Sequence, residues 1–207
     1  IDATIFSSYD GSSQYFRNLC NTPADGSRKS VYDFTLGATS STSTDDPTFT
    51  GAAGSPSAYF LFDGGDFFQL ASGVNTAFLN ALHKTTGGTS WWVAIAYKPL
   101  DIATTDFLWS TNAYTGNTRG MGMFQGSTEV LTLQQRGDSA SVNPTPSPAA
   151  VTPATDTLAI FSCDTSGNVR RWVNTRSKSA HTWTLNATST DAGQPLRIGG
   201  RSNNNNI

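Results

Sequence analysis

The sequence has few charged residues, and this shortage excludes some classes of partner. Asp, Glu, Lys and Arg make up 14% of the 207 residues, well below the roughly 25% that is usual in soluble domains. The net charge is −2, and the 13 Lys and Arg residues are scattered along the chain. Nucleic-acid binding calls for a basic face with clustered Lys and Arg, because the phosphate charges must be neutralised. Arg170 and Arg171 are adjacent, but strand alternation would send them to opposite faces. We therefore expect no nucleic-acid partner.

Long apolar runs are absent, and cysteine is scarce. No run reaches the roughly 20 apolar residues of a membrane-spanning helix, so membrane insertion is not expected. Cys20 and Cys163 are the only two cysteines, and the sequence leaves open whether they form one disulfide or two free thiols. A structural zinc site takes four Cys or His ligands, so two cysteines alone do not supply one.

The common signatures of catalysis are also missing. The chain contains a single glutamate, Glu129, whereas most glycoside hydrolases use a pair of carboxylates that flank the scissile bond. It has no G-x-S-x-G sequence, no H-E-x-x-H sequence, no EF-hand loop and no phosphate-binding loop. Its two histidines, His83 and His181, fall on an expected helix end and in an expected strand. We therefore expect no enzyme activity, with a hydrolase based on two aspartates as the least favoured alternative.

What the sequence does contain is period-two alternation, bounded by Gly, Asn, Asp, Ser and Pro. Residues 91–97 are apolar on both sides of the alternation, which predicts a central strand covered on both faces. The clearest hairpin joins Thr157–Cys163 to Val169–Asn174 through an Asp164–Asn168 turn. Further strands are expected at 129–135 (half-exposed), 181–185 and 195–200, and the one expected helix is Asn75–Lys84. Many short strands with one short helix indicate a β-sandwich or barrel.

We expect a single domain over residues 1–207. Its core sandwich spans 59–200, preceded by an N-terminal strand with its loops (1–58) and followed by a polar tail (201–207). Residues 37–57 are rich in Ser, Thr and Gly, and residues 139–155 carry four prolines. Both segments are expected to be surface loops within that one domain.

The segment Tyr59–Leu70 places two carboxylates and two glycines between aromatic runs. Asp63 and Asp66 are candidate oxygen ligands for Ca²⁺. The favoured interpretation is turn chemistry, in which an Asp carboxylate accepts backbone N–H bonds and glycine adopts positive φ. The expected structure is a hairpin turn between two aromatic strands, and no required cofactor is expected.

A sugar site needs an exposed aromatic ring beside planar polar groups, because sugar C–H faces stack on rings while hydroxyls need directional partners. Trp91, Trp92 and Trp172 fall in strand centres and are expected in the core. The candidate ligand-binding residues therefore come from a segment that reads as a loop. They are Trp109, Asn112, Tyr114, Asn117 and Arg119.

The order of these segments resembles a known family. FDGGDFFQL, SWWVAIAYKP, LAIFSCDTSGNVRRWVN and LRIGG follow one another as in LamG-like domains of the concanavalin A-like lectin/glucanase superfamily. This resemblance covers residues 59–200 and implies an antiparallel jelly-roll β-sandwich. In that family a further strand follows the IGG strand and closes the sheet, whereas this chain continues as RSNNNNI. Three explanations for the missing closing strand stay open. The sequence is truncated, an N-terminal strand over Ala3–Ser8 takes the position, or a neighbouring subunit supplies the strand.

The superfamily includes hydrolases as well as lectins, and its laminarinase-like members carry an E-x-D-x-x-E strand that is absent here. Some LamG relatives bind Ca²⁺ at a sandwich edge. The first third of the chain, including YDFTLG, resembles LamG-like domains of phage and prophage structural proteins. Together these resemblances imply a non-catalytic glycan-binding or adhesion module of a phage-like particle or bacterial surface assembly, as a fibre, spike or tail component. The alternative is a purely structural virion or cell-surface domain that contacts other subunits, with homo-oligomers included.

Overall fold

In the computed structural model of the chain, the described residues are 8–17, 32–70, 90–100, 105–111, 120–126, 131–136, 141–142, 151–166, 168–174, 179–182 and 194–200. Their strands are β1 (Tyr15–Phe16), β2 (Phe34–Leu36), β3 (Thr48–Thr50), β4 (Tyr59–Leu61), β5 (Phe68–Leu70), β6 (Trp91–Tyr97), β7 (Asp106–Ser110), β8 (Gly120–Gln125), β9 (Leu131–Arg136), β10 (Ser141–Val142), β11 (Thr157–Cys163), β12 (Asn168–Val173), β13 (Ser179–Thr182) and β14 (Arg197–Ile198). The predicted helix Asn75–Lys84 lies outside these residues, as do residues 1–7 and 201–207. The part described contains no helix of a length and apolarity that would cross a membrane.

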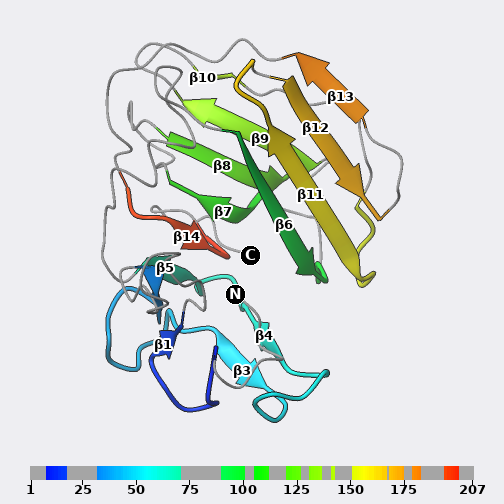
Figure 1. Ribbon diagram of the computed structural model, residues 1–207. Helices are drawn as coiled ribbons and strands as arrows, with labels where there is room; N and C mark the ends of the chain where they lie inside the picture. Colours follow the sequence, from blue (N-terminus) through cyan, green and yellow to red (C-terminus); the bar gives the residue numbers. More distant parts are fainter. Residues whose placement is uncertain are drawn as a thin grey trace, which may run out of the picture.

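The strands form three antiparallel sheets (Figure 1). The largest sheet has eight strands in the order β1-β2-β5-β14-β7-β8-β9-β10, and a four-stranded sheet, β13-β12-β11-β6, packs on its second half. A two-stranded sheet, β3-β4, packs on the first half. The chain passes between the two larger sheets after β5, β6, β10 and β13. The predicted all-β, antiparallel sandwich of the jelly-roll class is therefore confirmed.

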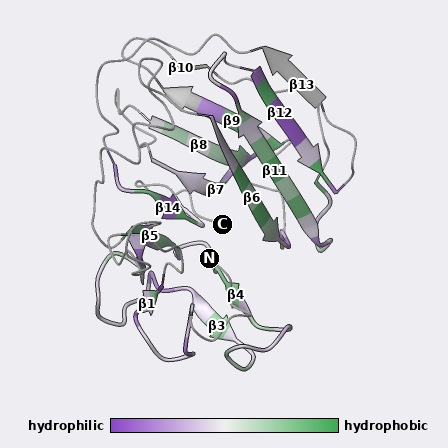
Figure 2. Ribbon diagram, in the orientation of Figure 1, coloured by the Kyte–Doolittle hydropathy of each residue, from purple (hydrophilic) through white to green (hydrophobic). Residues whose placement is uncertain are grey.

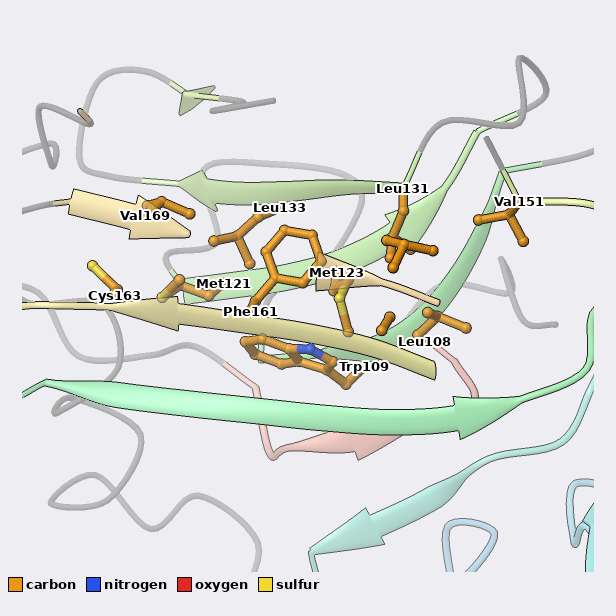
Figure 3. Close-up of a cluster of buried hydrophobic side chains, with 12 residues drawn as sticks. Leu108, Trp109, Met121, Met123, Leu131, Leu133, Val151, Phe161, Cys163 and Val169 are labelled. Carbon is orange, nitrogen blue, oxygen red and sulfur yellow. The ribbon is translucent and has the colours of Figure 1, made fainter. Parts of the chain in front are cut away.

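The two larger sheets are held together by a main core of buried apolar side chains (Figure 3). The eight-stranded sheet supplies one side, β11 and β12 supply the other, and one further side chain comes from the segment before β11. Burying each large apolar side chain contributes about 1.5–3 kcal/mol relative to leaving it in water. The buried members are Leu108, Trp109, Met121, Met123, Leu131, Leu133, Val151, Ala159, Phe161, Cys163, Val169 and Val173.

A second core, at the β3-β4 end, is mostly aromatic. Phe60 and Phe68 meet edge to face, with ring centroids 4.8 Å apart, and Phe16 lies 5.6 Å from Phe68. Tyr9 contacts Phe60 with centroids 4.9 Å apart. Edge-to-face pairs align the positive ring edge with the negative face of a neighbour, which adds to the gain from burial. This aromatic cluster fixes the small sheet against β2 and β5.

Three strand predictions need correction, and the first is that residues 91–97 form a central strand covered on both faces. Among the described strands β6 lies at the end of the four-stranded sheet, and Trp92 on one of its faces is largely exposed. Tyr59–Leu61 and Phe68–Leu70 do not pair as a hairpin, because β4 pairs with β3 while β5 pairs with β2 and β14. The Asp63–Asp66 turn instead carries the chain from the small sheet to the large one. The strand expected to be half-exposed is also buried on both faces, since Leu131, Thr132, Leu133 and Gln134 are all buried. β9 lies between β8 and β10, and polar side chains inside a sheet are tolerated where they find hydrogen bonds.

The hairpin predicted from TLAIFSCDTSGNVRRWVN is confirmed. β11 and β12 pair from Ala159↔Val173 to Cys163↔Val169. Asp164 organises the turn, because its Oδ1 accepts the backbone N–H of Ser166 and of Asn168, each at 2.9 Å. This hairpin, with β6 on its other edge, forms the surface that carries the candidate site.

Candidate functional site

The four-stranded sheet presents a largely apolar surface on the side away from the main core. Successive side chains of a strand point to opposite faces. In β11 the buried Ala159 and Phe161 alternate with partly exposed Ile160 and exposed Leu158. β6 and β12 follow the same pattern, so three strands supply what we call the outer face. Its side chains are Trp92, Ala94, Ala96, Leu158, Ile160, Ser162, Asn168, Arg170 and Trp172.

Strand register sets which of these side chains are neighbours. Ser162 pairs with Trp92 on one side and with Arg170 on the other. Ile160 in the same way lies between Ala94 and Trp172. Neighbouring strands are about 4.8 Å apart, so the backbones of Trp92 and Arg170 are separated by roughly 10 Å, with Ser162 between them. The first row thus brings together an indole, a hydroxyl and a guanidinium.

Trp92 is the most exposed large apolar side chain in the described part of the chain. Its exposed fraction is 73%, and that of Leu158 on the same face is 47%. Trp92 was predicted to be a core residue, and this prediction is wrong. Its neighbour Trp91 points inward and packs on the main core, 6.3 Å from Trp109 between ring centroids. Trp172 is also on the outer face, half-buried rather than in the core.

The polar side of the outer face is built by the Asp164 turn. The side-chain amide of Asn168 donates to Asp164 Oδ1 at 3.1 Å and to Oδ2 at 2.9 Å. These bonds, together with the backbone N–H groups of Asn168 and Ser166, lower the pKa of Asp164. Arg170 Nη1 lies 3.8 Å from Asp164 Oδ2, so the turn adds a carboxylate next to the guanidinium at the polar end of the row that contains Trp92 and Ser162. Figure 2 shows the hydrophilic stretch on β12 beside the more apolar β11 and β6.

The adjacent arginine, Arg171, has a different role. It is buried on the inner face, where Nη1 donates to the backbone oxygen of Leu131 at 3.1 Å. Burial lowers its pKa. The expectation that Arg170 and Arg171 point to opposite faces is confirmed, and only Arg170 is available to a ligand on the outer face.

The predicted loop site is described only at Trp109. This residue lies within β7, is 4% exposed and belongs to the main core. It is therefore not the exposed platform that we expected, because the apolar run preceding the loop forms a strand that faces the opposite sheet. Asn112, Tyr114, Asn117 and Arg119 lie outside the described residues.

The acidic turn at 63–66 has the geometry of the favoured interpretation. Asp66 is 2% exposed, and its Oδ2 accepts the backbone N–H of Asp63 at 3.0 Å. Gly64 has φ of 97°, a conformation that glycine adopts without steric cost. The described residues contain no group of three or more His, Cys, Asp or Glu placed to hold a metal ion.

The pKa of Asp66 differs strongly from its usual value. Loss of hydration by burial raises its pKa to about 6, and the nearby carboxyls of Asp63 and Asp46 act in the same direction. The hydrogen bond from the Asp63 backbone opposes the increase without cancelling it.

Comparisons with known proteins find no match in sequence and only limited similarity in structure. The sequence matches no protein-family model and no curated protein. Among solved structures, CBM40 of the Ruminococcus gnavus IT-sialidase has a TM-score of 0.47 at 16% identity, covering 63% of this chain and 71% of that one. The mouse laminin α1 chain, domains LG4-5, has a TM-score of 0.41 at 9% identity, with 57% and 31% covered.

A third similar structure is the binding domain of botulinum neurotoxin DC in complex with SialylT. Its TM-score is 0.43 at 10% identity, and the match covers 89% of this chain and 43% of that one. All three TM-scores are below 0.5. These similarities therefore assign neither a family nor a ligand to this chain, and the candidate site rests on its own residues.

Sequence reasoning missed the outer face because it treated apolar strands as buried. The alternation in β6 did carry a signal, since Trp92 shares a face with two small residues, Ala94 and Ala96. Small alanines lose little when they are left in water, because the free energy of burial scales with area. A large ring among small neighbours is thus compatible with exposure as well as with burial.

Proposed function

We propose that the chain is a non-catalytic glycan-binding module and that the outer face is its binding surface. The observation that carries the proposal is the exposed indole of Trp92, in register with Ser162 and Arg170. Exposed apolar patches rimmed by polar groups mark interaction sites in soluble proteins. Here the polar rim is the Asp164 turn with Arg170.

The chemistry of this row suits a sugar ring. An indole face packs against the apolar C–H face of a pyranose, while hydroxyl groups require donors and acceptors in fixed directions. Ser162 can donate and accept, and the guanidinium of Arg170 offers several donors in one plane. Trp172 lies in the next row, so a ligand of more than one sugar ring has a second aromatic contact on the same face.

The proposal includes a biological setting. A phage-like particle or a bacterial surface assembly, with this chain as part of a fibre, spike or tail, would present the outer face to polysaccharide outside the cell. This setting rests on the resemblance of the first third of the chain to phage and prophage proteins. A purely structural virion or surface domain is the alternative function.

The direct test is a glycan array with the wild-type chain and three variants. We expect the wild type to retain a subset of glycans. Trp92→Ala should lose at least about tenfold in affinity, because stacking on an exposed ring contributes about 1–3 kcal/mol in comparable ligand contacts. Arg170→Ala should lose somewhat less affinity. Leu100→Ala is the matched control, since Leu100 is a similarly exposed apolar side chain that is not part of the outer face.

The array also separates the alternatives. Equal retention by the wild type and Trp92→Ala would place any glycan site elsewhere and contradict the proposal. A wild-type chain that retains no bacterial or host polysaccharide would favour the structural alternative. Far-UV circular dichroism of each variant confirms that a loss of binding is not a loss of fold.

Two predictions from the sequence are tested by the same array. Tyr114→Ala reports whether the segment with Asn112, Asn117 and Arg119 adds contacts, and unchanged retention removes it from the site. Repeating the array in Ca²⁺ and in a chelator tests the calcium expectation for Asp63 and Asp66. If binding is equal under both conditions, Asp63 and Asp66 do not act as calcium ligands for glycan binding, and their function is to form the turn.

A further inference from the structure

The β6 strand is an exposed edge of the four-stranded sheet. It runs for seven residues, Trp91–Tyr97, and in the described part of the chain it pairs only with β11. The backbone groups on its other side point away from the sheet. An open strand edge of this length is a template for pairing with another chain.

The sandwich is also incompletely closed along this edge. Trp91, Val93, Ile95 and Tyr97 pack on the main core, yet each stays partly exposed. By contrast, Phe161 of β11, which faces the same core, is fully buried. Apolar area at the open edge therefore remains in contact with water and is available to be covered.

The usual protection of an edge strand is missing within β6. Natural sheets guard their edges with charged side chains, with proline or with bulges. Residues 91–97 contain no charged residue and no proline, and Lys98 and Pro99 come only after the strand has ended. Within β6, nothing in the sequence acts against pairing.

The β6 sequence is complementary to itself. In an antiparallel pair, side chains that lie directly opposite point to the same face. A two-fold axis at Ala94 is the register that pairs all seven residues. On the outer face it sets Trp92 of one copy opposite Ala96 of the other, so that a large ring meets a small side chain. On the inner face it sets Trp91 opposite Tyr97 and Val93 opposite Ile95.

We infer that the chain forms a homodimer in which the β6 strands of two copies pair antiparallel about Ala94. The two four-stranded sheets then join into one continuous sheet, with both outer faces on the same side. The contact is made by backbone hydrogen bonds and by the half-buried inner side chains. Because Trp92 of one copy then lies opposite Ala96 of the other, the dimer seam borders the proposed binding row, and the two proposals are tested separately, by light scattering and by glycan retention.

The test uses charge at the two-fold axis. In this register position 94 faces its own copy, and directly opposed like charges destabilise a strand pair. We expect the wild type to have twice the 22.0 kDa chain mass by light scattering at roughly 100 μM. We expect Ala94→Lys and Ala94→Glu each to dissociate at least about tenfold more readily, because juxtaposed like charges at an interface cost several kcal/mol. Mixing the two variants should restore a dimer, since position 94 then carries opposite charges.

Leu158→Lys is the control, because it adds the same charge to the outer face one strand away from the edge, and it should stay dimeric. A second measurement needs no variant: in the wild type, the backbone amides of β6 should exchange with deuterium more slowly at high than at low chain concentration. A monomeric wild type, or dimers that persist in both charge variants, would overturn the inference. So would concentration-independent exchange at β6.

Discussion

Two adjacent tryptophans show how much a single position decides in this protein. Trp91 points into the sandwich and meets Trp109 edge to face, whereas Trp92 points outward and is largely exposed. Strand alternation alone separates them. A shift of the pairing register by one residue would exchange their roles. The β11 partner strand pairs with β6 from Thr157↔Tyr97 to Cys163↔Trp91. This pairing therefore determines which of the two indoles is exposed.

The buried carboxyl of Asp66 predicts that the stability of the protein depends on pH. In the folded chain its pKa is about 6, whereas its usual value is 3.8. Between these values the folded state binds more protons than the unfolded state, so the free energy of unfolding falls as the pH rises from about 4 to about 7. The expected contribution of Asp66 to this fall is about 1–3 kcal/mol, because each unit of pKa difference between the folded and unfolded states corresponds to about 1.4 kcal/mol.

The variant Asp66→Asn isolates this effect. Asparagine cannot ionise, and its side-chain oxygen can still accept the backbone N–H of Asp63. The free energy of unfolding of the variant, measured with urea, should therefore fall less as the pH rises. Asp10→Asn is the control, because hydrogen bonds from the backbone of Ser12 and Ser13 lower the pKa of that exposed carboxyl instead. Parallel pH profiles for the wild type and Asp66→Asn would show that the buried carboxyl does not retain its proton.

Among the elements, β14 has more structural importance than its two residues indicate. Arg197 and Ile198 pair with β5 on one side and β7 on the other, so β14 joins the two halves of the eight-stranded sheet. The guanidinium of Arg197 donates to Gln69 Oε1 and lies 3.9 Å from the ring centre of Phe67. Gly199 follows, and its N–H donates to the backbone oxygen of Leu108 at 2.9 Å.

A pair of glycine variants tests the packing at this join. Gly199 and Gly64 both have positive φ, 82° and 97°. A Cβ at Gly199 would lie 2.2 Å from a Phe62 ring atom, whereas a Cβ at Gly64 would meet nothing within 4 Å. Gly64→Ala should lower the free energy of unfolding by about 1 kcal/mol from backbone strain alone. Gly199→Ala should cost about 1–3 kcal/mol more, because the aromatic core must shift. Equal costs by chemical denaturation would contradict this packing.

At the scale of the whole molecule, local patterns predicted local structure well. The β11–β12 hairpin and the all-β class follow from period-two alternation and from the Asp164 turn, which are properties of short segments. Pairing between distant strands was not readable in the same way. The pairing of β4 with β3 depends on the aromatic cluster, in which Tyr9, Phe16 and Phe60 come from segments far apart in the sequence.

The candidate site was missed for the same reason. Whether an apolar strand is central or at an edge depends on what packs beside it, and β6 carries apolar residues on both faces whichever is the case. Trp109 was taken as a loop residue because it precedes a polar stretch, yet the strand continues to Ser110. Charge and turn chemistry near Asp164 were readable from the sequence, but their position beside Trp92 was not.

The central claim is that Trp92, rather than a buried tryptophan, contacts a sugar. The most direct measurement is a nuclear magnetic resonance titration of the wild-type chain with the glycan that the array retains most strongly, following the indole N–H signals of the five tryptophans. Trp92→Ala identifies one signal by its loss. We expect the signal of Trp92 to shift most and that of Trp109 to stay in place. Shifts confined to other tryptophans, with Trp92 unmoved at saturation, would contradict the account.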